Sequence, residues 1–169
     1  MTTDDIQTIH AHSAVARVRA ALQLAGLADT ITVMPAATHT AQAAAEALGC
    51  DVGEIAKSII FRAGDGRAVL VITSGRNRVD GQKVAELIAQ AVGKADADFV
   101  RAQTGFVIGG VAPLGHAVAP ITLMDNDLLR YATIWPAAGH LNTMFSISSH
   151  DLARVTGARL ADISQRTIL

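Results

Sequence analysis

The feature that most constrains the fold is a pair of apolar runs within residues 57–75, KSIIFRAGDGRAVLVITSG. Both runs are rich in β-branched residues, and Gly64-Asp65-Gly66 between them is a triplet that tolerates positive φ. This pattern predicts an antiparallel hairpin. The chain must therefore build its core around a sheet that contains at least one antiparallel pair.

Apolar periodicity and capping residues predict the remaining elements, with helix N-caps at Thr38 or Thr40 and at Asp80 and a helix end at Gly49. Helices are expected at residues 13–26, 38–49, 51–56, 80–93 and 149–157, and strands at 31–35, 105–109, 120–125, 132–136 and 143–148. Residues 1–12 are polar and aperiodic, which predicts a flexible N-terminal extension before a single domain of residues 13–169. Strands and helices mixed in a short chain indicate an α/β fold, a mixed and curved sheet flanked by helices.

Composition excludes several classes of protein. Half of the 169 residues are hydrophobic, enough for a sizeable core, but no apolar run approaches the about 18 residues of a membrane span. The N-terminus lacks the order of a secretory signal, so a cytoplasmic protein with no membrane contact is expected. A net charge of −1 argues against coating long nucleic acid, DNA included, and leaves room only for a local contact.

Metal and disulfide chemistry find little support. The single cysteine, Cys50, excludes an intramolecular disulfide and a cysteine-rich zinc site. None of the six histidines is paired at H-x-x-x-H spacing, so no metal is expected. The run Ser149-His150-Asp151 is not a triad, because adjacent side chains do not converge, and Ser149 is interpreted as a helix N-cap.

Three features could carry chemistry, and each has a structural alternative. Lys57 opens an apolar strand, where it either extends to solvent or holds a positive charge at the mouth of a pocket. The loop TGFVIGGVAPLGH, residues 104–116, fits neither phosphate-binding pattern; it is either a backbone nest for a carbonyl oxygen or a tight turn that needs glycine. His140 lies between two strands, in a site or in an exposed loop. Basic residues gather in residues 57–83, as site cations or as solvated turn charges.

Taken together, these residues resemble a known family. The segments AKSIIFR, VLVITSGRNRVD, TGFVIGGVAPLGH and IWPAAGHLNTMFSISSHDLARVTGA occur in this order, and the resemblance that they carry covers roughly residues 38–163. They resemble the YbaK/EbsC family of free-standing aminoacyl-tRNA deacylases, which are related to the editing domain of bacterial prolyl-tRNA synthetase.

The resemblance implies a barrel-like mixed sheet and metal-independent hydrolysis of the ester that joins a wrong amino acid to tRNA, most often tRNA for proline. No cofactor is implied. The partners implied are the aminoacyl-tRNA acceptor end and prolyl-tRNA synthetase. Carried over by position, Lys57, Gly109 and Gly110 are the expected catalytic residues. The expected substrate-binding residues are Ser58, Ser74, Gly75, Val111, Pro113, Gly115, His140 and Asn142. The family is thought to use the ribose hydroxyl of the tRNA, rather than a protein nucleophile, to activate water.

Specificity stays open at this point. His140 and Asn142 occupy a segment that often carries polar groups in members that act on small amino acids, and Val111-Ala112 replace a cysteine or serine found in some relatives. Alanine, serine, threonine and cysteine all remain candidate amino acids. The alternative function is a non-catalytic module of the same fold that binds tRNA or a synthetase.

Overall fold

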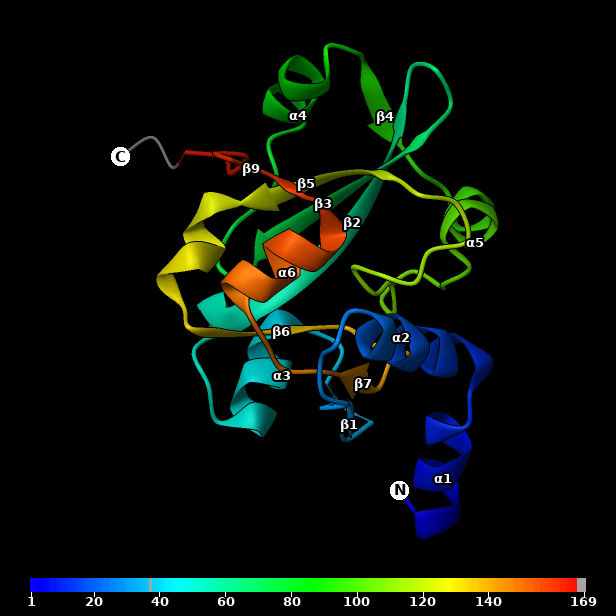
Figure 1. Cartoon of the computed structure of the whole chain (residues 1–169). Coiled ribbons are helices and arrows are strands. Elements are labelled where there is room, and N and C mark those ends of the chain that lie inside the picture. The colour runs from blue at the N-terminus through cyan, green and yellow to red at the C-terminus, as the bar shows by residue number, and fades with distance from the viewer. Residues whose placement is uncertain (37, 167–169) are drawn as a thin grey trace.

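The structure is a computed structural model that describes residues 1–36 and 38–166. Within these residues the main sheet has the order β8-β6-β2-β3-β5-β9, and β4 pairs with the far end of β2 (Figure 1). The strands of this sheet are β2 (Ile55–Ala63), β3 (Ala68–Ser74), β4 (Val92–Lys94), β5 (Ile121–Asp125), β6 (Thr133–Pro136), β8 (Ile147–Ser148) and β9 (Arg159–Ala161). A separate antiparallel pair joins β1 (Thr32–Val33) to β7 (Thr143–Met144).

The pairing is antiparallel between β2 and β3, and parallel between β3 and β5, β5 and β9, and β2 and β6. Helices flank the curved sheet: α1 (Thr3–His10), α2 (Ser13–Leu24), α3 (Ala41–Leu48), α4 (Gly81–Ile88), α5 (Ala97–Thr104) and α6 (Ser149–Thr156), with 3-10 turns η1 (Val52–Glu54) and η2 (Asn126–Arg130). The prediction of a mixed, curved sheet flanked by helices is confirmed. Among the described residues, no helix is long and apolar enough to cross a bilayer.

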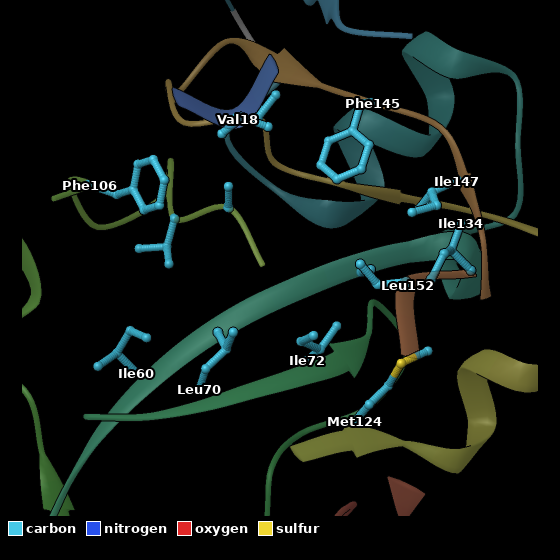
Figure 2. Close-up of a cluster of buried hydrophobic side chains, with 14 of the residues drawn as sticks. Val18, Ile60, Leu70, Ile72, Phe106, Met124, Ile134, Phe145, Ile147 and Leu152 are labelled. Carbon is cyan, nitrogen blue, oxygen red and sulfur yellow. The ribbon is translucent and has the colours of Figure 1, made fainter. Parts of the chain in front are cut away.

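The core lies on both faces of β3, whose residues are all buried. Leu70 and Ile72 face a cluster that also contains Phe106 and Phe145 and is closed by α2 and α6 (Figure 2). The intervening residues of β3, Val69 and Val71, face a second cluster under α4. Since successive side chains of a strand point to opposite faces, this strand supports both layers of the core.

Local capping chemistry was predicted well. Thr40 accepts the Ala43 N–H at the start of α3, and Gly49 ends that helix in the left-handed conformation. Asp80 caps α4. The hairpin, the helices predicted near these caps and the strands at 120–125 and 132–136 are confirmed.

Several elements differ from the sequence expectation. Residues 3–10 form α1, which begins with a capping box between Thr2 and Asp5. None of its residues is buried, so its sequence lacks the apolar periodicity that predicts a helix. The strand expected at 105–109 is absent from the described fold, because Gly105 and Gly109 adopt positive φ of 76° and 90°. The N-cap of α6 is Ser148 rather than Ser149, whose hydroxyl donates to the Tyr131 carbonyl.

The helix α5 and the short strands β4 and β9 were not anticipated, and residues 143–148 form two strands rather than one. Each of the two missed strands has three residues, too few for a periodic signal. The division into a flexible extension and a domain of residues 13–169 stays a prediction, and its end at residue 169 lies outside the described residues.

Shortening a buried side chain of the central strand β3 should destabilise the protein. We expect Leu70→Ala to lower the free energy of unfolding by about 2–5 kcal/mol, because Leu70 is fully buried and its removal leaves a cavity. Val118→Ala is the control: Val118 is 51% exposed, and its loss should change stability by about 0.5 kcal/mol or less. Urea unfolding of both variants measures the difference, and equal midpoints would contradict the role given to β3.

Candidate functional site

A small cavity of about 200 Å³ lies at the start of β2. Four of the residues singled out from the sequence line it: Lys57, Ser58, Gly109 and Val111. The other lining residues come from the 38–44 segment, the first residues of β2 and the 137–144 segment, namely Thr38, His39, Thr40, Ala41, Ala44, Ile55, Ala56, Ala137, Leu141, Thr143 and Met144. The lysine strand and the glycine loop, residues 104–116, therefore meet at one concave site. The apolar lining residues carry no local sequence signal, because they look like ordinary core positions.

Lys57 points its ammonium group at a backbone carbonyl. Its Nζ donates to the Asn77 carbonyl oxygen over 2.7 Å, which leaves two of its three N–H donors for a ligand. Partial burial lowers the pKa of this lysine, and the nearby Arg78 lowers it further, while the Asp125 carboxylate acts in the opposite direction. The side chain is thus neither fully solvated nor paired in a salt bridge within the described residues.

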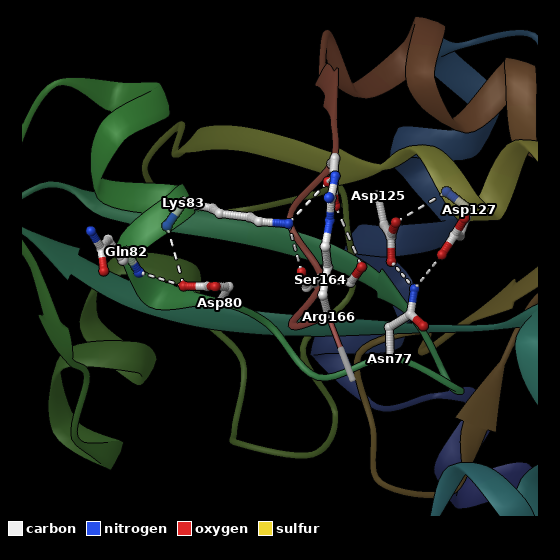
Figure 3. A network of polar contacts seen from close by, with 9 residues as sticks. Asn77, Asp80, Gln82, Lys83, Asp125, Asp127, Ser164 and Arg166 are labelled. Atoms are coloured by element: carbon white, nitrogen blue, oxygen red, sulfur yellow. Dashed lines mark hydrogen bonds and ion pairs between the residues drawn. The ribbon is translucent and has the colours of Figure 1, made fainter. Parts of the chain in front are cut away.

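A buried carboxylate fixes the turn whose carbonyl holds Lys57, and Figure 3 shows the bonds that Asn77 of this turn makes to Asp125 and Asp127. Asp125 Oδ2, at the end of β5, accepts from Thr73 Oγ1 over 3.0 Å and from Asn77 Nδ2 over 2.8 Å. The same Asn77 amide donates to Asp127 over 2.8 Å. Asn77 is therefore held by its side chain while its carbonyl accepts the lysine. Sequence reasoning missed this network; its one available sign was a run of acidic residues directly after an apolar strand.

The glycine loop is braced from several sides. The Arg17 guanidinium donates to the Gly105 carbonyl over 2.6 Å and lies over the Phe106 ring. At the other end, His116 Nε2 contacts the Ala112 carbonyl over 2.6 Å, and burial lowers the pKa of that imidazole. Both ends of the loop are therefore braced by contacts within the protein.

The two glycines at the centre of the loop approach protein backbone and side chain closely. A Cβ on Gly109, whose φ is 90°, would lie 2.7 Å from Leu141 Cδ2, and one on Gly110 would lie 3.0 Å from the His140 carbonyl carbon. The Gly110 N–H already donates to the Val107 carbonyl over 3.0 Å. The Gly110 N–H is therefore already bonded within the protein and is not free to donate to a substrate. The backbone N–H groups of Gly109 and Val111 are the better candidates to donate to a ligand.

His140 and Asn142 belong to a turn beside the small cavity, whose lining includes their neighbours Leu141 and Thr143. The Asn142 N–H donates to His140 Nδ1 over 3.2 Å, and Thr143 closes the turn on the His140 carbonyl. Burial lowers the pKa of His140, and His12, whose ring lies 5.3 Å away, lowers it further. His140 and Asn142 thus support the turn that forms one wall of the small cavity, although they do not line it themselves.

The remaining predicted residues do not line the small cavity. Ser74 donates its hydroxyl to the Gly53 carbonyl over 2.8 Å, and Gly75 leaves no room for a side chain beside the Val52 carbonyl. Pro113 is buried in the loop. Gly115, with φ of 78°, packs against α2. Their observed contacts are structural, and their place in substrate binding stays a prediction.

The basic residues of 57–83 divide into two groups. Arg67, Arg76 and Lys83 form ion pairs with Asp65, Asp51 and Asp162, as solvated turn charges do. Lys57, Arg62 and Arg78 have no acidic partner within the part of the chain that the structure describes. No cluster of histidine, cysteine or carboxylate side chains suited to a metal occurs among the described residues.

Comparison with known proteins gives one consistent result. The family described as "Aminoacyl-tRNA editing domain" matches residues 35–155. The uncharacterized protein YwhH of Bacillus subtilis is 28% identical over 78% of this chain and 84% of its own length. The "Putative Cys-tRNA(Pro)/Cys-tRNA(Cys) deacylase EbsC" of Enterococcus faecalis is 23% identical over 75% of this chain and 78% of its own. A crystal structure described as "a putative trans-editing enzyme for prolyl tRNA synthetase" has a TM-score of 0.87 at 37% identity, covering 92% of this chain and 99% of its own.

The contact between the glycine loop and the 140–141 backbone can be tested with one methyl group. Gly110→Ala should push these segments apart by a few tenths of an ångström, which lowers stability and distorts the small cavity. Thermal unfolding and the rate of the reaction proposed below measure the two effects. Gly64→Ala is the control, because a Cβ there meets only ordinary contacts of 3.7 Å or more. A Gly110→Ala protein with unchanged melting temperature and rate would show that the close approach has no consequence.

Proposed function

The chain belongs to the aminoacyl-tRNA editing domain family, and on that premise we propose that it hydrolyses the ester bond of misacylated tRNA in trans. The proposed substrate is tRNA for proline that carries a small non-cognate amino acid: alanine, serine, threonine or cysteine. We further propose that the protein acts in the cytoplasm, on tRNA released by prolyl-tRNA synthetase.

One observation carries the proposal: a lysine and a glycine loop, both typical of the family, meet at a single small cavity. A cavity of about 200 Å³ holds a small acyl group and excludes an acceptor stem. The rest of the tRNA must then lie outside, where Arg78, which lies near Lys57, supplies positive charge for its phosphates.

The proposed chemistry needs no protein nucleophile. Ser58 lines the cavity with a buried hydroxyl, but no base among the described residues forms a hydrogen bond to it, so nothing activates it. Water adds to the ester carbonyl carbon, the bond to the ribose oxygen breaks, and that oxygen takes up a proton. The products are the free amino acid and uncharged tRNA. The ribose hydroxyl next to the ester is the group proposed to orient the water.

Two protein elements stabilise the charge that develops on the carbonyl oxygen. The free N–H donors of Lys57 provide a cation, and the backbone N–H groups of Gly109 and Val111 provide neutral donors in the glycine loop. Because the Asn77 carbonyl and the loop braces hold these donors in place, little reorganisation is needed at the moment of reaction.

The amino acid is selected by the size of the cavity. One methylene is worth about 1–3 kcal/mol of discrimination in such a pocket, so neighbouring small amino acids should overlap as substrates. Leu141 and Met144 are among the larger side chains that line the cavity, and the His140 turn holds the segment that contains Leu141.

A panel of tRNAs charged with different amino acids tests the proposal directly. Purified protein should release alanine, serine, threonine or cysteine from tRNA for proline faster than spontaneous hydrolysis, and should spare correctly charged prolyl-tRNA. The loss of ester is followed with a labelled terminal adenosine. Binding of tRNA without turnover of any of these esters would favour the non-catalytic module instead.

The charge of Lys57 should govern the rate and its pH dependence. Lys57→Ala is expected to lower the single-turnover rate by about 10²–10³ with little change in stability, and Arg67→Ala, a paired turn residue, should have no effect. Since the cationic form is the active one and its pKa is lowered, the enzymatic rate above background should fall at a lower pH than for an ordinary lysine. Lys57→Arg should remove that alkaline fall, and an unchanged pH profile would return Lys57 to a structural role.

A further inference from the structure

A second cavity of about 630 Å³ adjoins the small cavity and is not used by the reaction described above. Three residues line both cavities: Ser58, Gly109 and Val111. A ligand that reaches from one to the other would have two parts, a small one and a larger one, joined close to Ser58. Aminoacyl-tRNA has this form, with an amino acid on one side of an ester and a nucleoside on the other.

The walls of the second cavity are largely apolar. They include Ile59 and Phe61 of β2, Ala85 of α4, Val92 of β4 and Ile108 of the glycine loop. Ile108 is 57% exposed to solvent. Apolar walls open to water favour the flat, apolar face of a ring system over a charged or strongly hydrated group.

The cavity also lies along an unpaired stretch of strand edge. On the side away from β3, β2 pairs with β6 at residues 55–56 and with β4 at residues 61–63, and no described strand pairs with residues 57–60 between them. The Ile55 carbonyl accepts from the Gly75 N–H, and the Ala63 N–H donates to the Arg67 carbonyl, so the odd-numbered residues of β2 point their backbone groups toward β3.

By the alternation of an antiparallel pair, the N–H and C=O groups of Ser58 and Ile60 point toward the open edge. Both residues line the second cavity. Among the described residues, no loop segment forms a backbone hydrogen bond with either of them. Backbone groups in this position need a partner, and a ligand with an adjacent donor and acceptor can supply one.

We propose that the second cavity binds the terminal adenosine of the acceptor end, with the adenine edge paired to the free backbone of β2, an inference that rests on the function proposed above. The 6-amino group and N1 of adenine are an adjacent donor and acceptor, matching a strand C=O and N–H. The Ser58 hydroxyl is buried without a partner at the junction of the cavities and takes a ribose hydroxyl.

Charge at the rim agrees with this occupant. Lys94 lines the second cavity, as does Phe61, its partner in the β2–β4 register. Lys94 forms no ion pair within the described part of the chain. An uncompensated cation suits the phosphates that lead to the terminal nucleoside better than it suits a lipid tail or an apolar peptide.

Binding can be measured without any turnover. Adenosine 5′-monophosphate and the trinucleotide CCA, titrated into isotopically labelled protein, should shift the amide signals of Ser58 and Ile60 and the methyl signals of Ala85 and Ile108. Uridine 5′-monophosphate, whose single ring covers less of the apolar walls, should bind more weakly. Shifts confined to the small cavity, or a second cavity that takes the apolar dye anilinonaphthalene sulfonate but neither nucleotide, would overturn the proposal.

A cavity-filling variant connects the site to the reaction. Ala85→Phe should raise the KM for misacylated tRNA about tenfold or more with a smaller change in kcat, because it removes binding rather than chemistry. Glu86→Phe is the matched control, an exposed neighbour on α4 that lines neither cavity. Equal KM values for the two variants would overturn the adenosine site and leave the deacylase proposal intact. Binding of adenosine 5′-monophosphate at Ala85 and Ile108 in a protein that deacylates no tRNA would support the nucleoside site and overturn the proposed activity.

Discussion

The antiparallel pairing of β2 with β3 is the constraint on which the rest of the molecule depends. β3 is buried on both faces, so its register with β2 fixes which β2 side chains enter each layer of the core. The register places Lys57 opposite Thr73, whose hydroxyl bonds the buried Asp125. A slip of one residue would turn the lysine to the opposite face of the sheet and separate it from the Asn77 carbonyl that holds it.

Elements governed by neighbouring residues could be predicted from the sequence, and contacts between distant residues could not. The caps at Thr40 and Asp80 and the 57–75 hairpin each depend on a few adjacent positions. The bond between Asn77 and Asp125 joins residues 48 positions apart, and the acidic residues after the strand do not reveal which residue they bind. Only the family resemblance brought Lys57 and the glycine loop together in advance. Composition and periodicity alone left each of them with a structural alternative.

The glycine loop shows that a motif can be located correctly in the sequence while the physical role of its glycines is inferred only in part. Its glycines were interpreted as space for a ligand, and Gly109 does line the small cavity. Gly110 instead leaves space for the backbone of residues 140–141 and donates its own N–H to the Val107 carbonyl. A glycine is needed wherever any backbone approaches closely, whether it belongs to a substrate or to the protein, and the sequence does not distinguish the two cases.

The small cluster behind α3 has a practical consequence. Trp135, the one tryptophan of the sequence, packs there with Ala44, Ile55 and Met144, and these three residues also line the small cavity. Its indole is thus one layer of side chains away from the proposed ester site. Intrinsic fluorescence therefore offers an optical reporter, free of any attached dye, whose emission follows the surroundings of that cavity as ligands enter and leave.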